Sequence, residues 1–243
     1  MAMSVPLKRT ALHYQNLALN AAMVDHGGWQ RPERYGLPEE EVQAVRAGVG
    51  LCDISPVGKL DLKGTESVPV LERLFFPSAV PRLGQVQRMV LKNTDRVAVV
   101  EGFCCRLGSD HVLIITAPGT VAAAEQTLMQ YMEAANGCMH LTNLTSALAA
   151  VQLVGPYSRD LLCKLTALDL SPRQFADLTC AQGSVAKVHA FVVRADIGSE
   201  LAYEVYCGRE FGEYLWDTLR DAGQEFGVVP FGVAAQRLLR AEA

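Results

Sequence analysis

The segment 45–64 reads VRAGVGLCDISPVGKLDLKG and carries four glycines. The residues just before it, 38–46, read PEEEVQAVR, and a proline followed by three glutamates is typical of a first helical turn. Gly48 and Gly50 are expected to end this helix. Residues 59–63 then alternate charged and leucine side chains, which predicts a strand with one solvated face. The segment therefore predicts a helix, a glycine turn and a strand.

Asp53 stands in the middle of this corner, between Cys52 and Ile54. A carboxylate in such apolar surroundings should be buried, and burial requires hydrogen-bond partners. We expect those partners to be backbone amides of the glycine turn or Ser55. A structural role is favoured over a catalytic one.

The flanking sequence extends this pattern in both directions. Residues 26–37 read as a loop, and 65–76 as a helix that ends at Pro77. Residues 96–108 and 110–116 predict paired strands around a polar turn, followed by an alanine-rich helix over 118–135 that ends at Gly137. Two more strands and two helices are expected to complete the chain.

An internal repeat appears at a fixed offset of 91 residues. Residues 59–74, KLDLKGTESVPVLERL, align with 150–165, AVQLVGPYSRDLLCKL, glycine on glycine. The same offset places 111–116 on 202–207, and a helix is expected after each. Two long copies predict an α+β pair of related subdomains packed around a shared cleft; chance similarity is the alternative.

Composition excludes several classes of partner. The chain has 243 residues, 50% of them hydrophobic, and a formal net charge of -4, so it offers no basic surface for nucleic acid. No signal-like or membrane-spanning segment is found, and we expect a soluble, cytoplasmic protein. The seven cysteines include no CxxC pair and are expected to be reduced core thiols. The five histidines are scattered, so no metal site is expected.

Two motifs carry a family resemblance. Residues 21–36, AAMVDHGGWQRPERYG, resemble the pattern MVDFAGW.MP..Y, and residues 45–64 resemble AVR..VGLFDVSHMGK..V.G. The similarity continues through VQLVGPYSRDLL (151–162), AYEVY (202–206) and FGVAAQRLLRAEA (231–243). These patterns are typical of the aminomethyltransferase family, that of the T-protein of the glycine cleavage system.

The resemblance implies a fold and a domain organisation. It implies a folate-binding α+β domain over 1–243, with mainly antiparallel sheets, flanking helices and two interlocked halves of about 51–137 and 1–50 plus 138–243. Family members carry a further C-terminal β-barrel domain. Since the chain stops at Ala243, the resemblance implies that this barrel is absent here.

The resemblance also implies a chemistry and two acidic site residues. Tetrahydrofolate would accept an aminomethyl carbon from a lipoyl carrier protein, giving methylenetetrahydrofolate and ammonia. The family's assisting aspartate corresponds to Glu101, which the strand period places among apolar neighbours on the face of Val97, Val99 and Phe103. Glu204 matches the glutamate that binds the pterin ring, which offers adjacent N–H donors to a carboxylate.

Other positions depart from the family pattern. Gln236 replaces an arginine, with Arg240 beside it; Arg88 replaces a tyrosine and Thr116 an asparagine. Residues 196–200, DIGSE, replace GYTGE. We take Arg88, Thr116 and Gln236 as candidate folate contacts and Arg240, with Asp53, as a structural residue of the cleft.

These departures leave two functions open. The first is a folate-dependent one-carbon transferase with the same or an altered donor. The second is a non-catalytic folate-binding or accessory subunit, acting beside a separate partner chain, that keeps the scaffold without the usual catalytic residues.

Overall fold

The computed structural model describes residues 7–76, 80–93, 97–134 and 138–241. The chain divides into two compact units, which we describe separately. The first unit comprises residues 1–56, 146–177 and 182–243, and the second comprises residues 57–145 and 178–181.

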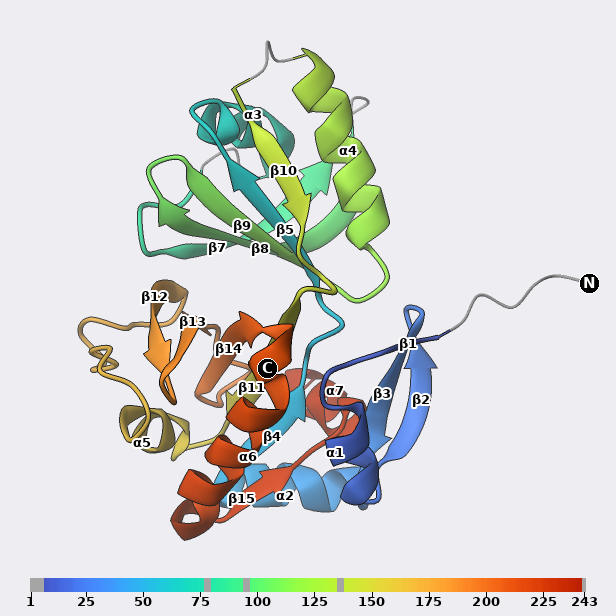
Figure 1. Cartoon of the computed structure of the whole chain (residues 1–243), viewed down its shortest axis with the longest axis vertical. Coiled ribbons are helices and arrows are strands. Elements are labelled where there is room, and N and C mark those ends of the chain that lie inside the picture. Colours follow the sequence, from blue (N-terminus) through green and yellow to red (C-terminus); the bar gives the residue numbers. More distant parts are fainter. Residues whose placement is uncertain (1–6, 77–79, 94–96, 135–137, 242–243) are drawn as a thin grey trace, which may run out of the picture. The chain divides into compact units, whose positions relative to one another are not determined.

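The second unit is built on a six-stranded sheet in the order β10-β5-β9-β8-β7-β6, in which neighbouring strands are antiparallel (Figure 1). Its strands are β5 (Gly58–Lys63), β6 (Phe75–Phe76), β7 (Val86–Lys92), β8 (Ala98–Gly108), β9 (His111–Thr116) and β10 (His140–Asn143). Helices α3 (Ser67–Leu74) and α4 (Val121–Ala134) cover one face. The predicted hairpin and both predicted helices are confirmed, while the stops assigned to Pro77 and Gly137 lie outside the described residues.

The helix-covered face of this sheet forms the core of the second unit. Its buried side chains come from alternate positions of four strands, namely Leu60, Leu62, Met89, Leu91, Val100, Cys104, Val112 and Ile114. Alternation along a strand sends the intervening side chains to the other face.

The solvated face predicted for β5 is wrong. Lys59 is 0% exposed and Asp61 is 7% exposed. Lys59 Nζ donates to the carbonyl oxygen of Thr145 at 3.2 Å, and Asp61 bonds His111 at 2.5 Å and Lys63 at 2.9 Å. Charged groups can be buried when they are paired in this way, so alternation alone did not reveal their environment.

The first unit contains a second six-stranded sheet, in the order β12-β13-β14-β11-β4-β15, although residues 179–181 of β12 are assigned to the second unit. Its strands are β4 (Val49–Asp53), β11 (Leu148–Val154), β12 (Thr179–Val185), β13 (Val188–Arg194), β14 (Ala202–Gly208) and β15 (Val228–Pro230). Strand β15 runs parallel to β4, whereas β4, β11, β14 and β13 are antiparallel in turn.

Helices cover both faces of this sheet (Figure 1). Helices α5 (Ser158–Cys163) and α6 (Gly212–Gly223) lie on the face that carries Ala149, against which Gly212 packs. Helix α2 (Pro38–Ala47) and the segment leading into α7 (Val233–Ala241) lie on the opposite face, where Val45 and Phe231 pack on Gly50. The short 3-10 helices η1 (Arg209–Phe211) and η2 (Gln224–Phe226) flank α6.

A small three-stranded sheet completes the first unit. It joins β1 (Lys8–Arg9), β3 (Trp29–Arg34) and β2 (Ala22–His26), and helix α1 (His13–Ala18) follows β1. The loop predicted over 26–37 is wrong, because β2 and β3 form a hairpin there. Its two-residue turn is made by Gly27 and Gly28, with φ of 63° and 79°, the left-handed values that such a turn requires.

The internal repeat is confirmed in the strand register. Lys59 in β5 pairs with Ile115 in β9, and the residues 91 positions later, Ala150 in β11 and Tyr206 in β14, pair in the same way. Strands β4 and β10, which precede β5 and β11, are exchanged: β4 pairs with β11 and β10 pairs with β5. Each sheet therefore includes one strand from the other copy of the repeat, and the mixed α+β fold with mainly antiparallel sheets is confirmed.

Equivalent glycines follow β5 and β11. Gly64 has a φ of 123° and Gly155 a φ of 120°, a region that side chains rarely adopt. A Cβ at Gly64 would overlap the carbonyl oxygen of Cys138, and one at Gly155 would overlap that of Val45. Both backbone conformation and close approach therefore require glycine at this corner.

The prediction for the C-terminal part of the chain is too sparse. In the described residues after α4, 138–241, there are six strands, β10 to β15, and three α-helices, α5 to α7, rather than two of each. The β12–β13 hairpin turns at Ala186 and Lys187, which have φ of 51° and 66°. Because neither residue is glycine or asparagine, the turn carries no sequence signal.

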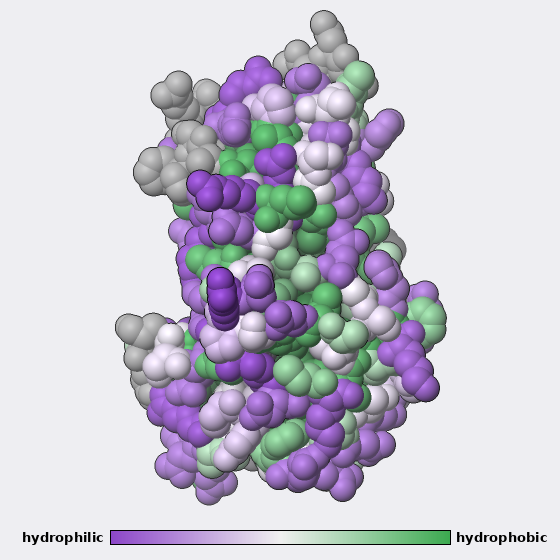
Figure 2. Space-filling view, turned by 90° about the vertical axis from the view of Figure 1, so that its left-hand side faces the viewer, coloured by the Kyte–Doolittle hydropathy of each residue, from purple (hydrophilic) through white to green (hydrophobic). Residues whose placement is uncertain are grey.

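The surface of both units is mixed in character. On the face drawn in Figure 2, hydrophilic side chains cover most of each unit, with smaller apolar patches between them. Among the described residues, no helix combines the length and apolar composition needed to cross a bilayer. Cys138 and Cys163 are exposed, whereas the other five cysteines are buried as expected.

Candidate functional site

Glu204 lies in the middle of β14, between β11 and β13. The register places Gln152 and Val193 directly opposite it on the two neighbouring strands. Glu204 is 6% exposed and Gln152 is 1% exposed. A carboxylate so deeply buried needs hydrogen-bond donors around it.

Both oxygens of the Glu204 carboxylate accept a hydrogen bond. Gln152 Nε2 donates to Oε1 at 3.1 Å, and the Tyr206 hydroxyl donates to Oε2 at 2.5 Å. Tyr206 lies two residues along the same strand, so it shares a face with Glu204. The Phe191 ring stacks on Tyr206 at a centroid distance of 4.4 Å and an interplanar angle of 8°. The carboxylate is therefore held between an amide and an aromatic pair.

Helix α7 contributes a further member of this cluster. Val233 and Gln236 are buried on one side of the helix, three residues apart. Gln236 Nε2 donates to Gln152 Oε1 at 2.6 Å. Gln236, Gln152, Glu204 and Tyr206 thus form a continuous chain of hydrogen bonds, which we call the Glu204 network.

The neighbour of Gln152 on its other side is a protonated thiol. Cys52 lies opposite Gln152 on β4. Burial raises the pKa of Cys52 to about 12, although the nearby Arg31 opposes this shift. Cys52, Gln152 and Glu204 thus lie side by side on three neighbouring strands as an uncharged thiol, an amide and a carboxylate. Of the three, the Glu204 carboxylate is the strong hydrogen-bond acceptor.

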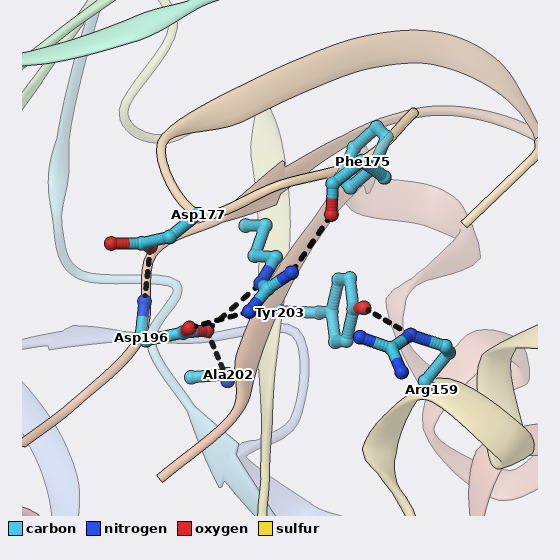
Figure 3. Close-up of polar contacts among 7 residues, drawn as sticks. Arg159, Phe175, Asp177, Asp196, Ala202 and Tyr203 are labelled. Atoms are coloured by element: carbon cyan, nitrogen blue, oxygen red, sulfur yellow. Dashed lines mark hydrogen bonds and ion pairs between the residues drawn. The ribbon is translucent and has the colours of Figure 1, made fainter. Parts of the chain in front are cut away.

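The segment that leads into β14 is fixed by an arginine–aspartate pair. Figure 3 shows Asp196 beside Asp177 and Ala202. Arg194 donates to both carboxylate oxygens of Asp196, at 3.1 and 2.7 Å, and to the carbonyl oxygen of Phe175 at 2.9 Å. The Ala202 amide donates to Asp196 at 3.1 Å, and the Asp196 amide donates to Asp177 at 2.9 Å. The hydrogen bonds to Asp196 raise the pKa of Arg194, while burial lowers it. In the DIGSE segment, Asp196 therefore anchors the start of the strand that carries Glu204.

A second arginine holds the residue beside Glu204. Arg159 Nε donates to the Tyr203 hydroxyl at 3.3 Å (Figure 3), and the Phe175 ring stacks on Tyr203 at 6.1 Å. Tyr203 points to the sheet face opposite Glu204, because neighbouring residues of a strand alternate. Both faces of β14 are thereby fixed at this point.

Three other candidate residues lie in the second unit. The register sets Arg88 opposite Phe103 and Val90 opposite Glu101, so Arg88 and Glu101 share one sheet face. The Arg88 guanidinium lies 5.1 Å from the centre of the Phe103 ring. Thr116 is buried and pairs with residues of the other, helix-covered face. The structure thus brings Arg88 and Glu101 to one face and places Thr116 on the other.

The apolar surroundings predicted for Glu101 are not observed. Glu101 is exposed, as is Val97, and Val99 and Phe103 are only partly buried. The strand period was read correctly, but the helices of this unit cover the alternate face, which carries Val100. Periodicity shows which residues share a face and not which face is covered.

The two predicted structural residues differ in their environments. Asp53 is 0% exposed and accepts hydrogen bonds from Thr10 Oγ1 at 2.7 Å, Asn16 Nδ2 at 3.0 Å and the Ser55 amide at 3.0 Å. The predicted bond to Ser55 is confirmed, and the side chains of Thr10 and Asn16 were not anticipated. Arg240 is exposed at the end of α7 and has no hydrogen bond or ion pair to another described residue, which gives a structural role no support.

Sequence reasoning missed the partners of Glu204. Gln152 lies within a strand pattern of apolar residues, and nothing in its neighbourhood marks it as functional. Tyr206 belongs to the AYEVY motif but was not singled out. The offset repeat aligns the two copies but does not show that β11 pairs with β14, so it gives no signal for Gln152.

Known proteins share this fold. Its class is a mixed α+β domain with mainly antiparallel sheets. Residues 12–243 match the family described as the GCVT N-terminal domain, and the chain belongs to this family.

Two relatives and two solved structures illustrate the range of the family. The aminomethyltransferase of Anoxybacillus flavithermus is 31% identical over 239 residues, which cover 98% of this chain and 64% of the relative. The sarcosine oxidase alpha subunit of Corynebacterium sp. (strain U-96) is 31% identical over 254 residues, covering 98% of this chain and 26% of the relative. The glycine cleavage system aminomethyltransferase T of Bartonella henselae superposes with a TM-score of 0.84 at 21% identity, covering 98% of this chain and 63% of that one. A chain of the heterotetrameric sarcosine oxidase of Corynebacterium sp. U-96 superposes with a TM-score of 0.65 at 19% identity, covering 91% of this chain and 97% of that one.

The chain therefore spans less than two thirds of the length of the aminomethyltransferases it matches. The superpositions establish the fold, and the sequence matches establish the family.

Proposed function

We propose that this chain binds a reduced folate through Glu204 and serves as a tetrahydrofolate-dependent one-carbon transferase. The observation that carries the proposal is the buried Glu204 carboxylate, which is held by Gln152 and Tyr206. Relatives of similar sequence are named aminomethyltransferases. In this proposal the two units together form one folate-binding domain of aminomethyltransferase type.

The Glu204 carboxylate is an acceptor that fits the N–H donors of a pterin ring. A carboxylate that is fixed on both oxygens can accept adjacent ring and exocyclic N–H groups as a pair. Gln236 supports the site from α7 through Gln152 rather than by a bond of its own to Glu204. The folate supplies the nucleophilic nitrogen that takes up the one-carbon unit, and Glu204 serves to hold and orient the ring.

We propose roles for two residues of the second unit. We propose Glu101 as the carboxylate that orients the reacting nitrogen and stabilises the positive charge that develops on it. Arg88, on the same face as Glu101, is proposed as a further folate contact. Thr116 is buried on the opposite face, which does not fit the expected contact. A glutamate reaches about one methylene further than an aspartate, and displacement of about 1 Å can lower a rate about a hundredfold.

The proposed reaction transfers the carbon of an aminomethyl group to tetrahydrofolate as a methylene group, breaks the carbon–sulfur bond to the carrier, and releases ammonia and the dithiol form of the lipoyl arm. The carbon would arrive on a lipoyl carrier protein, and an altered donor is compatible with the same folate site. The chain is proposed to act in the cytoplasm as part of one-carbon metabolism, in the glycine cleavage system or an equivalent.

Calorimetric titration with 5-formyltetrahydrofolate tests the binding site. We expect the natural protein to bind and Glu204→Gln to bind about 100-fold more weakly, because hydrogen bonds to a charged group are lost. Glu213→Gln, on the exposed side of α6, is the matched control and should bind normally. Equal affinity in all three proteins would contradict the proposal.

A second candidate is a folate-binding accessory subunit without catalysis of its own. The exposure of Glu101 favours this alternative, as does a relative that is the alpha subunit of a sarcosine oxidase. Ammonia release from an aminomethyl-loaded lipoyl carrier separates the two. A transferase loses turnover on Glu101→Gln but keeps it on Glu72→Gln, an exposed control in α3. An accessory subunit binds folate and shows no turnover in any of the three proteins.

A further inference from the structure

We infer that Gln236 and Gln152 form an amide relay that holds the Glu204 carboxylate in the position where it accepts hydrogen bonds from the N–H donors of a ligand. Both residues are positioning residues, since they act through Glu204 rather than on the ligand. The inference deepens the proposed folate function and rests on it for the identity of the ligand.

The Glu204 carboxylate determines the orientation of the Gln152 amide. An ionised carboxylate can only accept hydrogen bonds, so Gln152 must turn its NH2 group toward Glu204. The observed bond, Gln152 Nε2 to Glu204 Oε1 at 3.1 Å, has this direction. The amide oxygen of Gln152 is then aimed away from Glu204.

The second step fixes the orientation of the next amide. Gln152 Oε1 can only accept, so the group that meets it must donate. Gln236 supplies that donor through Nε2 at 2.6 Å. A side chain at position 236 that only accepts would favour the reversed Gln152 amide, which would point its oxygen at Glu204.

Burial makes the direction energetically important. Gln152 is 1% exposed and Gln236 is 7% exposed, so water has little access to replace a missing partner. A reversed amide would oppose its oxygen to a carboxylate oxygen, and buried acceptors that face one another are costly. The Tyr206 hydroxyl holds the other oxygen of Glu204, which prevents the carboxylate from turning away.

The consequence for the ligand is a chemical selection. The carboxylate accepts only, so a ring with adjacent N–H groups binds and a ring that presents acceptors there is rejected. The relay keeps the carboxylate in the position that meets both N–H groups. A pterin ring, with a ring N–H beside an exocyclic amino group, has the required donors.

A donor and an acceptor at position 236 test the direction of the relay. Gln236→Lys only donates and Gln236→Glu only accepts, and both bury a charge. Binding of 5-formyltetrahydrofolate is expected to weaken about 100-fold in Gln236→Glu and by much less in Gln236→Lys. Gln224→Met, in an exposed position of η2, is the control and should bind normally. Equal losses in the two charged variants would overturn the inference.

A double-mutant cycle separates the relay from simple packing. Gln152→Met and Gln236→Met are each expected to weaken binding about 10-fold, and the double variant should be no weaker than either single one. Two independent structural roles would instead add to about 100-fold, and that result would overturn the relay.

If 5-formyltetrahydrofolate does not bind, the proposed folate function is wrong but the relay is not yet tested. A measurement without ligand then tests the relay. The 1H–15N signals of the Gln152 side-chain amide report its partners directly. We expect large shifts in Gln236→Glu and smaller ones in Gln236→Lys. Signals that are the same in all variants would overturn the relay whatever the ligand is.

Discussion

Replacement of Asp53 should destabilise the first unit severely. The carboxylate is 0% exposed and accepts three hydrogen bonds, from Thr10, Asn16 and the Ser55 amide, at 2.7, 3.0 and 3.0 Å. Asp53→Ala leaves three buried donors without their acceptor, and each such loss costs about 1–3 kcal/mol. Because the site can relax in part, we expect about 3–5 kcal/mol in total.

Asp53→Asn refines the same test. The asparagine can keep the bond from the Ser55 amide, but it turns an NH2 group toward Asn16 and Thr10. We expect a loss of about 2 kcal/mol, between the natural protein and Asp53→Ala. Asp221→Ala, at an exposed position of α6, is the control and should cost less than about 0.5 kcal/mol.

Tryptophan fluorescence during urea unfolding is the suitable assay. The chain has two tryptophans, Trp29 and Trp216, and both lie in the first unit with Asp53 and are buried. The signal therefore reports on the unit that carries the substitution, which matters because a protein of two units need not unfold in one step. A loss below about 1 kcal/mol for Asp53→Ala would refute the reasoning that this carboxylate holds the corner.

Three further predictions concern glycines, a histidine and thiols. Gly64→Ala and Gly155→Ala should each lower the free energy of unfolding by several kcal/mol, and by similar amounts, because both positions combine a positive φ with a close carbonyl oxygen. A urea titration in which one of the two variants is as stable as the natural protein would contradict the equivalence of the two glycines. Burial and, to a smaller extent, the nearby Arg31 lower the pKa of His26. The unfolded chain therefore binds the proton more readily than the folded chain, and stability should fall as the pH drops below about 6.5. His26→Gln should flatten this pH dependence in melting scans at pH 5.5 and 7.5, and an unchanged slope would count against the prediction. Cys138 and Cys163 are exposed and should react first with iodoacetamide, as read by peptide mass spectrometry, and early labelling elsewhere would contradict the burial pattern.

Local signals in the sequence predicted the elements that carry them. Pro38 and the glutamates after it marked α2, and the leucine alternation marked β5. Hairpins were missed where the signal was weak or was read as a loop. The Gly27–Gly28 turn was visible in the sequence, whereas the turn at Ala186 and Lys187 was not, because ordinary residues adopt left-handed conformations there.

The candidate site could be predicted only in part. Glu204 was found through its motif, and its burial agrees with a binding role. Gln152 lies about 50 residues away in the sequence and meets Glu204 only because β11 and β14 pair. Gln236 was expected to contact folate, but its amide nitrogen bonds Gln152. Side-chain partners across strands depend on register, which composition and periodicity do not specify.

The most direct measurement is a crystal structure of the protein with 5-formyltetrahydrofolate, read for electron density beside Glu204. The proposed function predicts a pterin ring whose N–H groups lie about 3 Å from the two carboxylate oxygens. A folate bound elsewhere, with the Glu204 network intact and no ring against it, would contradict the central claim.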